Sequence, residues 1–159
     1  MSGYLVVWAA FGVVANSLAL LAGRLSDASP DLAMVAPQLG GAVMIGAGVY
    51  QLTPLKQACL SKCRTPTQFI LTSWRDGLAG AFRMGLGHGA YCLGCCWLLF
   101  VILFPLGIMN IAAMGVVALL VLAEKTLPVG RRLSQLVGLA LVAMGLAIVL
   151  LPGLLPTTM

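Results

Sequence analysis

The sequence predicts an all-α membrane protein, a polytopic helical bundle of about five transmembrane helices with one short interfacial helix. Hydrophobic residues make up 61% of its 159 residues and charged residues only 8%, against ~45–50% and ~25% in soluble domains. The chain also contains four stretches of at least 23 residues without a charged side chain. These observations exclude a soluble domain, a disordered chain and a basic nucleic-acid-binding protein.

The uncharged stretches locate the expected helices, since one crossing of a bilayer takes ~20 apolar residues. The stretch over 84–123 has 40 residues and would extend ~60 Å as one helix. Pro105, Gly107 and Asn110 predict a turn within it. All of these helices belong to one integral membrane domain covering 1–159. The expected spans are 4–21, 33–52, 84–104, 108–123 and 133–151.

The longest polar interval, between the second and third spans, predicts the short interfacial helix. Pro66 opens this segment, and Phe69 and Trp74 are expected at the depth of the lipid headgroups, where aromatic residues are enriched. The interval is not a repeat or a low-complexity linker, so it does not divide the chain into two domains.

The distribution of positive residues predicts the orientation. Arg24 is the only cation after the first span, whereas the other eight fall on the opposite side. The positive-inside rule places those eight in the cytoplasm, with the N-terminus cytoplasmic and the C-terminus external. The first stretch lacks the basic start of a signal peptide and is expected to be a retained span. The eight are Lys56, Lys62, Arg64, Arg75, Arg83, Lys125, Arg131 and Arg132.

The five cysteines and the only histidine fall into two tight groups. Cys59 and Cys63 are four residues apart, and at about 100° per residue they share a helix face. In the third span the same geometry places several donors on one face, with Cys96 at its edge and Trp97 pointing away. The glycines of this span keep it thin, so that neighbouring helices can approach closely. The residues on the face are Met84, His88, Cys92 and Cys95.

Three interpretations compete for these cysteines. Free cysteine is a good small apolar filler, but this does not explain the grouping with a histidine, which is costly inside a membrane. A disulfide is disfavoured on the cytoplasmic side, and five is an odd number. Metal binding explains the grouping best, because thiolates and imidazoles suit Cu(I), Zn(II) or an iron–sulfur cluster. Met84, Met109 and Met114 favour copper over zinc.

Several runs of residues closely resemble a bacterial family of predicted metal-binding integral membrane proteins, some of which are labelled copper chaperones. The resemblance extends from about Tyr4 to Leu150, and it implies a bacterial inner-membrane protein that handles metal. Members commonly carry a further methionine-rich span upstream, which this sequence lacks, so its site is expected to be incomplete if those methionines bind the ion. The runs are Tyr50 to Lys56, Cys59 with Cys63-Arg64, Trp74-Arg75 with Gly77, His88 to Trp97, Gly107 with Met109-Asn110, and Glu124-Lys125 with Pro128 and Gly130.

We therefore expect a protein without catalytic activity that captures Cu(I), with zinc as the second candidate ion, and delivers it to a membrane cuproenzyme or exporter. No zinc-protease helix and no phosphate-binding loop occurs. One alternative is a non-catalytic accessory subunit of a larger membrane complex, packed by small-residue helix faces, and another is a redox-active dithiol protein. The expected ligands, three or four at a time, are Cys59, Cys63, His88, Cys92, Cys95 and Cys96.

Polar residues beside the cysteines have two possible roles. Tyr50, Gln51 and Thr53 could orient ligands by hydrogen bonds, although Tyr50 also suits an interfacial anchor. Lys56, Lys62 and Arg64 could favour thiolates, or could simply contribute to the cytoplasmic charge. We expect Glu124 to form an ion pair with Lys125 or a nearby arginine.

Overall fold

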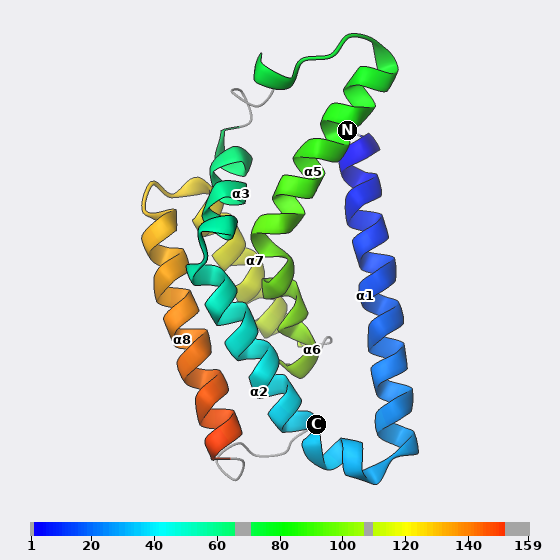
Figure 1. Ribbon diagram of the computed structural model, residues 1–159, viewed down its shortest axis with the longest axis vertical. Coiled ribbons are helices and arrows are strands. Elements are labelled where there is room, and N and C mark those ends of the chain that lie inside the picture. Colours follow the sequence, from blue (N-terminus) through cyan, green and yellow to red (C-terminus); the bar gives the residue numbers. More distant parts are fainter. Residues whose placement is uncertain (1, 66–70, 107–109, 152–159) are drawn as a thin grey trace.

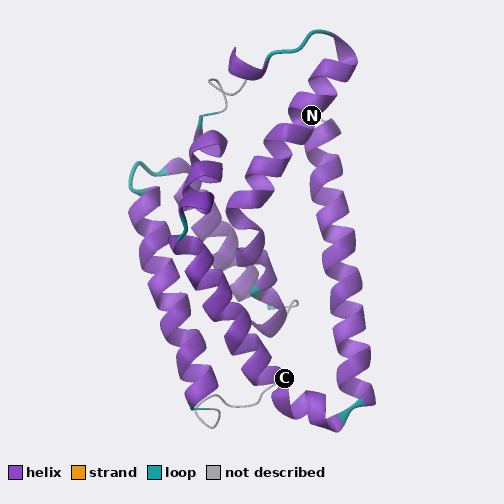
Figure 2. Ribbon diagram, viewed as in Figure 1, coloured by secondary structure: helices purple, strands orange, loops and turns teal. Residues whose placement is uncertain are grey.

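The computed structural model describes residues 2–65, 71–106 and 110–151, and it confirms the all-α prediction. Helices dominate this part of the chain, and none of it is strand. Short connections join several of these helices directly (Figure 2). The helices are α1 (Ser2–Ala28), α2 (Pro30–Leu52), α3 (Pro54–Arg64), α5 (Gly77–Val101), α6 (Leu103–Leu106), α7 (Ile111–Thr126) and α8 (Gly130–Leu150).

The long helices form an elongated bundle in which α2 and α8 pack side by side and α1 packs against α5 (Figure 1). The short helix α3 follows α2 directly and lies against α5 and α7. The α1–α2 connection lies at the opposite end of the bundle from α3. The shared core between α2, α5, α7 and α8 is apolar, with Met44, Leu99 and Leu141 among its buried side chains.

Glycines set the close spacing of these helix pairs. A Cβ atom added at Gly48 would lie 2.6 Å from the carbonyl oxygen of Gly138, and one at Gly145 would lie equally close to the carbonyl of Gly41. On the other side of the bundle, a Cβ at Gly3 would collide with the carbonyl of Phe82. The backbones therefore meet directly, as small residues allow in membrane helix packing.

Three of the described helical segments are long and apolar enough to cross a membrane: Ser2–Ala28, Gly77–Pro105 and Gly130–Leu150. Each is longer than the span expected from the sequence. Charged residues end an apolar stretch, but they do not end a helix, so α1 continues through Arg24 and Asp27. At 16 residues, α7 extends only ~24 Å, short of the ~30 Å hydrocarbon core.

The helix α3 occupies the start of the polar interval between the second and third expected spans. Thr53 caps it: its Oγ1 accepts a hydrogen bond from the backbone N–H of Lys56 at 3.4 Å. Pro54 then takes the first helical position, where a missing N–H costs nothing. The expected interfacial helix begins on residues 66–70, which lie outside the described part of the chain.

The positive residues are gathered at one end of the bundle. The segments that carry eight of the nine cations are α3, the start of α5 with the residues before it, and the region where α7 meets α8. These segments lie together, far from the α1–α2 connection (Figure 1). This end also holds α3 and its two cysteines, so most of the charge and the first cysteine group occupy the same region.

Candidate metal centre

The two cysteine groups meet where α3 packs against α5. Cys92, Cys95 and Cys96 of α5 are buried, with no more than 4% of each exposed. Cys59 and Cys63 of α3 are half-buried. Leu60 packs with Cys95 and Cys96, and Trp8 of α1 covers this cluster. All five cysteines are free thiols.

Three thiols from the two helices interact with one another. Cys63 lies beside Cys92 and Cys95, and the neighbouring thiols together with burial raise the pKa of Cys63 to about 11. The interaction with Cys92 lowers this pKa, but the interaction with Cys95 and the burial of the thiol outweigh it. Cys63 is therefore protonated at neutral pH, and a metal ion that binds there must displace a proton.

Two thiols of α5 are held by the backbone. The Sγ atoms of Cys95 and Cys96 each donate a hydrogen bond to the carbonyl oxygen of Cys92 at 3.0 Å. This arrangement satisfies both thiols locally, within one turn of α5. Either sulfur has to turn away from that carbonyl before it can bind an ion.

Lys125 of α7 reaches into this site, a role that the sequence analysis missed. Its Nζ donates to the Sγ of Cys92 at 2.9 Å, and its charge also acts on Cys63, Cys95 and Cys96. An ammonium beside a sulfur stabilises the thiolate that forms when the thiol loses its proton to an incoming ion. The sequence offered one signal, a lysine at the end of an apolar helix, but it could not show which way the side chain turns.

His88 lies on the side of the site that faces α1. Its ring centroid is 6.2 Å from that of Tyr4, and the Tyr4 hydroxyl is 3.5 Å from the Sγ of Cys92. Tyr4 thus contacts both a candidate imidazole ligand and a candidate thiol ligand. The sequence analysis had assigned no role to Tyr4.

Cys59 lies against the other edge of α5. A Cβ atom added at Gly94 would be 3.2 Å from the Cys59 Sγ, so this glycine makes room for the sulfur. The hydroxyl of Tyr50 donates to the carbonyl of Gly94 at 2.5 Å, and its ring packs edge-on against Trp97. Tyr50 therefore fixes α2 to the same turn of α5.

The side chains converge without forming a ready-made ligand cage. Over the described ranges, no group of three or more His, Cys, Asp or Glu side chains has an arrangement that could hold a metal ion. The local reasons are the two thiols bonded to the Cys92 carbonyl and the ammonium on the Cys92 sulfur. The donor set suits a soft ion, but binding one requires side-chain rotation.

Comparison with known proteins identifies the family. A family model described as "Copper chaperone" (PpoB2) matches residues 1–148. The chain belongs to this family. Its membership confirms the resemblance noted in the sequence, and the family name implies copper handling without catalysis. No curated protein and no solved structure matches the chain.

In this member of the copper chaperone family, Glu124 does not pair with Lys125 or with an arginine, so that prediction was wrong. Its Oε2 is 2.7 Å from the Nζ of Lys56, and the two side chains are 2% and 0% exposed. Successive residues of a helix point ~100° apart, which directs Glu124 towards α3 and Lys125 towards the thiols. Burial lowers the pKa of Lys56, although Glu124 counteracts this effect.

The residues at the end of α2 support the site through the backbone and this ion pair. Gln51 donates to Glu124, and Thr53 donates to the Tyr50 carbonyl while capping α3. Asn110, which was expected in a turn, lies directly before α7. Its side chain accepts a hydrogen bond from the backbone N–H of Ala113 at 3.1 Å and so caps this helix.

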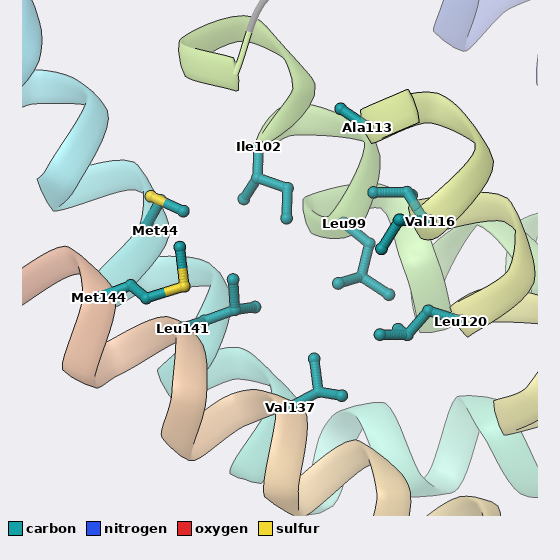
Figure 3. Close-up of a pocket in the computed structure, with 10 residues that line it drawn as sticks. Met44, Leu99, Ile102, Ala113, Val116, Leu120, Val137, Leu141 and Met144 are labelled. Atoms are coloured by element: carbon teal, nitrogen blue, oxygen red, sulfur yellow. The ribbon is translucent and has the colours of Figure 1, made fainter. Parts of the chain in front are cut away.

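A separate cavity of about 230 Å³ lies deeper in the bundle, between α2, α5, α7 and α8. Figure 3 shows Met44 and Met144 on one side of it, facing Leu99 and Val116. All of its lining residues are apolar, and none is a cysteine, histidine or carboxylate. A metal site in this cavity would have only the thioethers of Met44 and Met144 as donors, so the thiols at the junction of α3 and α5 are the better candidate for a metal centre.

Proposed function

We propose that this protein is a membrane-embedded copper chaperone that captures Cu(I) at the junction of α3 and α5. The observation that carries the proposal is the convergence of thiols from two helices beneath one lysine. Cys63, Cys92 and Cys95 would form the primary ligand set. Cys59, Cys96 and His88 would supply further ligands during exchange.

The chemistry of the donors favours Cu(I) over zinc. Thiolates are soft ligands that select Cu(I), although they also bind zinc. Three thiolates around a monovalent ion leave a net charge of minus two, and Lys125 would neutralise one of these two charges in the poorly solvated site. Lys56 cannot take this role because Glu124 already compensates its charge.

Capture would proceed by ligand exchange. An arriving Cu(I) would bind first to the Cys92 sulfur that Lys125 contacts, and the Cys92 thiol would give its proton to water as it binds. The thiols of Cys63 and Cys95 then release their protons to water and turn towards the ion. Since Cys95 and Cys96 share one carbonyl acceptor, either can replace the other as the ion leaves. Low-coordinate thiolate sites of this kind allow the ion to pass to a partner without ever being free.

The proposed setting is the bacterial inner membrane, crossed five times. Three helices meet the requirement for a span, and α2 and α7 would provide the other two, with α7 short or tilted. The cationic end of the bundle would face the cytoplasm, which places the N-terminus there and the C-terminus outside. A membrane cuproenzyme or a copper exporter would receive the ion.

Anaerobic purification followed by metal analysis tests this function. The full chain and a variant with all five cysteines changed to serine are expressed with added copper, or with added zinc. We expect near-stoichiometric copper in the unchanged chain, less zinc, and neither metal in the serine variant. Equal metal content in both chains would contradict the proposal and favour the accessory-subunit interpretation.

A further inference from the structure

A buried polar cluster lies beside the thiols, and the copper chemistry does not use it. Lys56 of α3 and Glu124 of α7 form its ion pair at 2.7 Å. Gln51 of α2 donates to the second carboxylate oxygen at 3.4 Å. The hydroxyl of Ser134 in α8 is 3.2 Å from both the carbonyl and the side-chain oxygen of Gln51. All four side chains are at most 2% exposed.

The cluster joins four helices at one point, and α3 is the shortest of them. Eleven residues make α3 only about three turns long. Its opposite end is held by Arg64, whose guanidinium makes an exposed hydrogen bond to the carbonyl of Leu127 after α7. Cys59 and Cys63 lie between these two attachments. The position of both sulfurs therefore depends on how firmly α3 is fixed to α7.

The two attachments differ in strength. Exposed charged contacts contribute little, because water competes and long side chains lose entropy. A buried pair is a poor source of stability but a strict geometric constraint, since an uncompensated buried charge is costly. The cluster at Lys56 is thus the attachment that can fix the rotation and height of α3.

We propose that the buried Lys56–Glu124 pair is a positioning device that holds α3 in the register at which Cys63 meets Cys92 and Cys95. This inference rests on the proposed function, because it gives that site its geometry. Neither residue touches the ion. The pair acts through α3, and its loss lowers copper affinity about 10- to 100-fold, as loss of groups that orient metal ligands commonly does.

A copper-free thiol reaction tests the positioning directly. In full-length chains that keep only Cys63 and Cys92, diamide oxidises the two thiols to a disulfide and is itself reduced to a hydrazine. The rate is followed by mass spectrometry in membranes. The test variant is Lys56→Met with Glu124→Gln, which removes both charges and avoids an unpaired one. Asp27→Asn, an exposed carboxylate at the far end of α1, is the matched control.

We expect the disulfide to form several-fold more slowly in the double variant and at the unchanged rate in Asp27→Asn. Thermal unfolding of the same samples verifies that both are folded. An unchanged rate in a folded double variant would overturn the proposal. Because no copper is present, this result is independent of whether the protein binds copper, which the metal analysis decides separately.

Discussion

Two lysines at the same end of the bundle have opposite electrostatic surroundings. Lys56 is fully buried and bonded to a carboxylate, so its charge is compensated within the protein. Lys125 is half-buried and bonded to the Cys92 sulfur, and no carboxylate among the described residues forms an ion pair with it. The first lysine fixes structure whether or not an ion is present. Lys125, in contrast, has an opposite charge beside it only when a neighbouring thiol has lost its proton.

This difference separates a rigid part of the site from an exchangeable part. The cluster around Lys56 has hydrogen-bond partners for each of its side chains, and such satisfied buried networks favour one arrangement. The thiols around Lys125 are bound through weak, replaceable hydrogen bonds. A chaperone needs both properties, because it must hold a defined site and still release its cargo.

The largest expected effect is a loss of stability when the buried Lys56–Glu124 ion pair is broken. Lys56→Met leaves Glu124 buried without its cation, so we expect about 3–5 kcal/mol less stability. Lys62→Met makes the same change at an exposed position of the same helix, and it should cost far less. Unfolding in mild detergent measures both. Equal losses in the two variants would show that the buried pair has no special role.

The next effect is on copper affinity, from removing the other lysine. Lys125→Met deletes the cation that stabilises a thiolate at Cys92, and we expect an affinity loss of about 10- to 100-fold with near-normal stability. Lys125→Arg keeps the charge and should lose less. Competition with a chromophoric Cu(I) chelator measures these affinities, with the exposed Arg131→Met as control. Normal copper binding by Lys125→Met would show that Lys125 does not stabilise a thiolate ligand.

The protonated state of the thiols predicts a pH dependence. Since the pKa of Cys63 is raised to about 11, copper must displace its proton throughout the physiological range. Affinity should therefore rise with pH, about tenfold per unit for each proton released. Proton release on copper addition, measured at pH 6 to 9, checks this dependence. A pH-independent affinity would mean that Cys63 is not a ligand.

The smallest effect comes from crowding one sulfur without changing any charge. Gly94→Ala would bring a methyl group 3.2 Å from the Cys59 Sγ. Gly115→Ala is the matched control, because nothing lies within 4 Å of its added Cβ. Alanine favours helix by up to ~1 kcal/mol over glycine, so the control should gain stability. Gly94→Ala should gain less and bind copper a few-fold more weakly, and identical behaviour would remove Cys59 from the site.

Composition and residue spacing predicted the features that depend only on nearby sequence and not on contacts between helices. The apolar stretches located long helices, and the i,i+4 spacing put Cys59 and Cys63 on one face of α3. Side-chain direction within a helix followed from 100° per residue, which is why the buried cysteines of α5 were predicted together. These properties are local, and they require no knowledge of neighbouring helices.

The contacts between helices could not be predicted in the same way. Lys56, Lys125 and Glu124 read as ordinary charges at the ends of spans, because their partners are 33 to 68 positions away. The partner of Glu124 depends on where α3 packs against α5 and α7, which a single sequence does not show. Tyr4 was missed for the same reason, since only the packing of α1 brings it to Cys92.

The ligand atoms of bound copper test the central claim most directly. X-ray absorption at the copper edge is measured on the anaerobically loaded chain and on Cys63→Ser. The account predicts Cu(I) surrounded by sulfur in the first and one fewer sulfur scatterer in the second. A nitrogen or oxygen shell that Cys63→Ser leaves unchanged would contradict it.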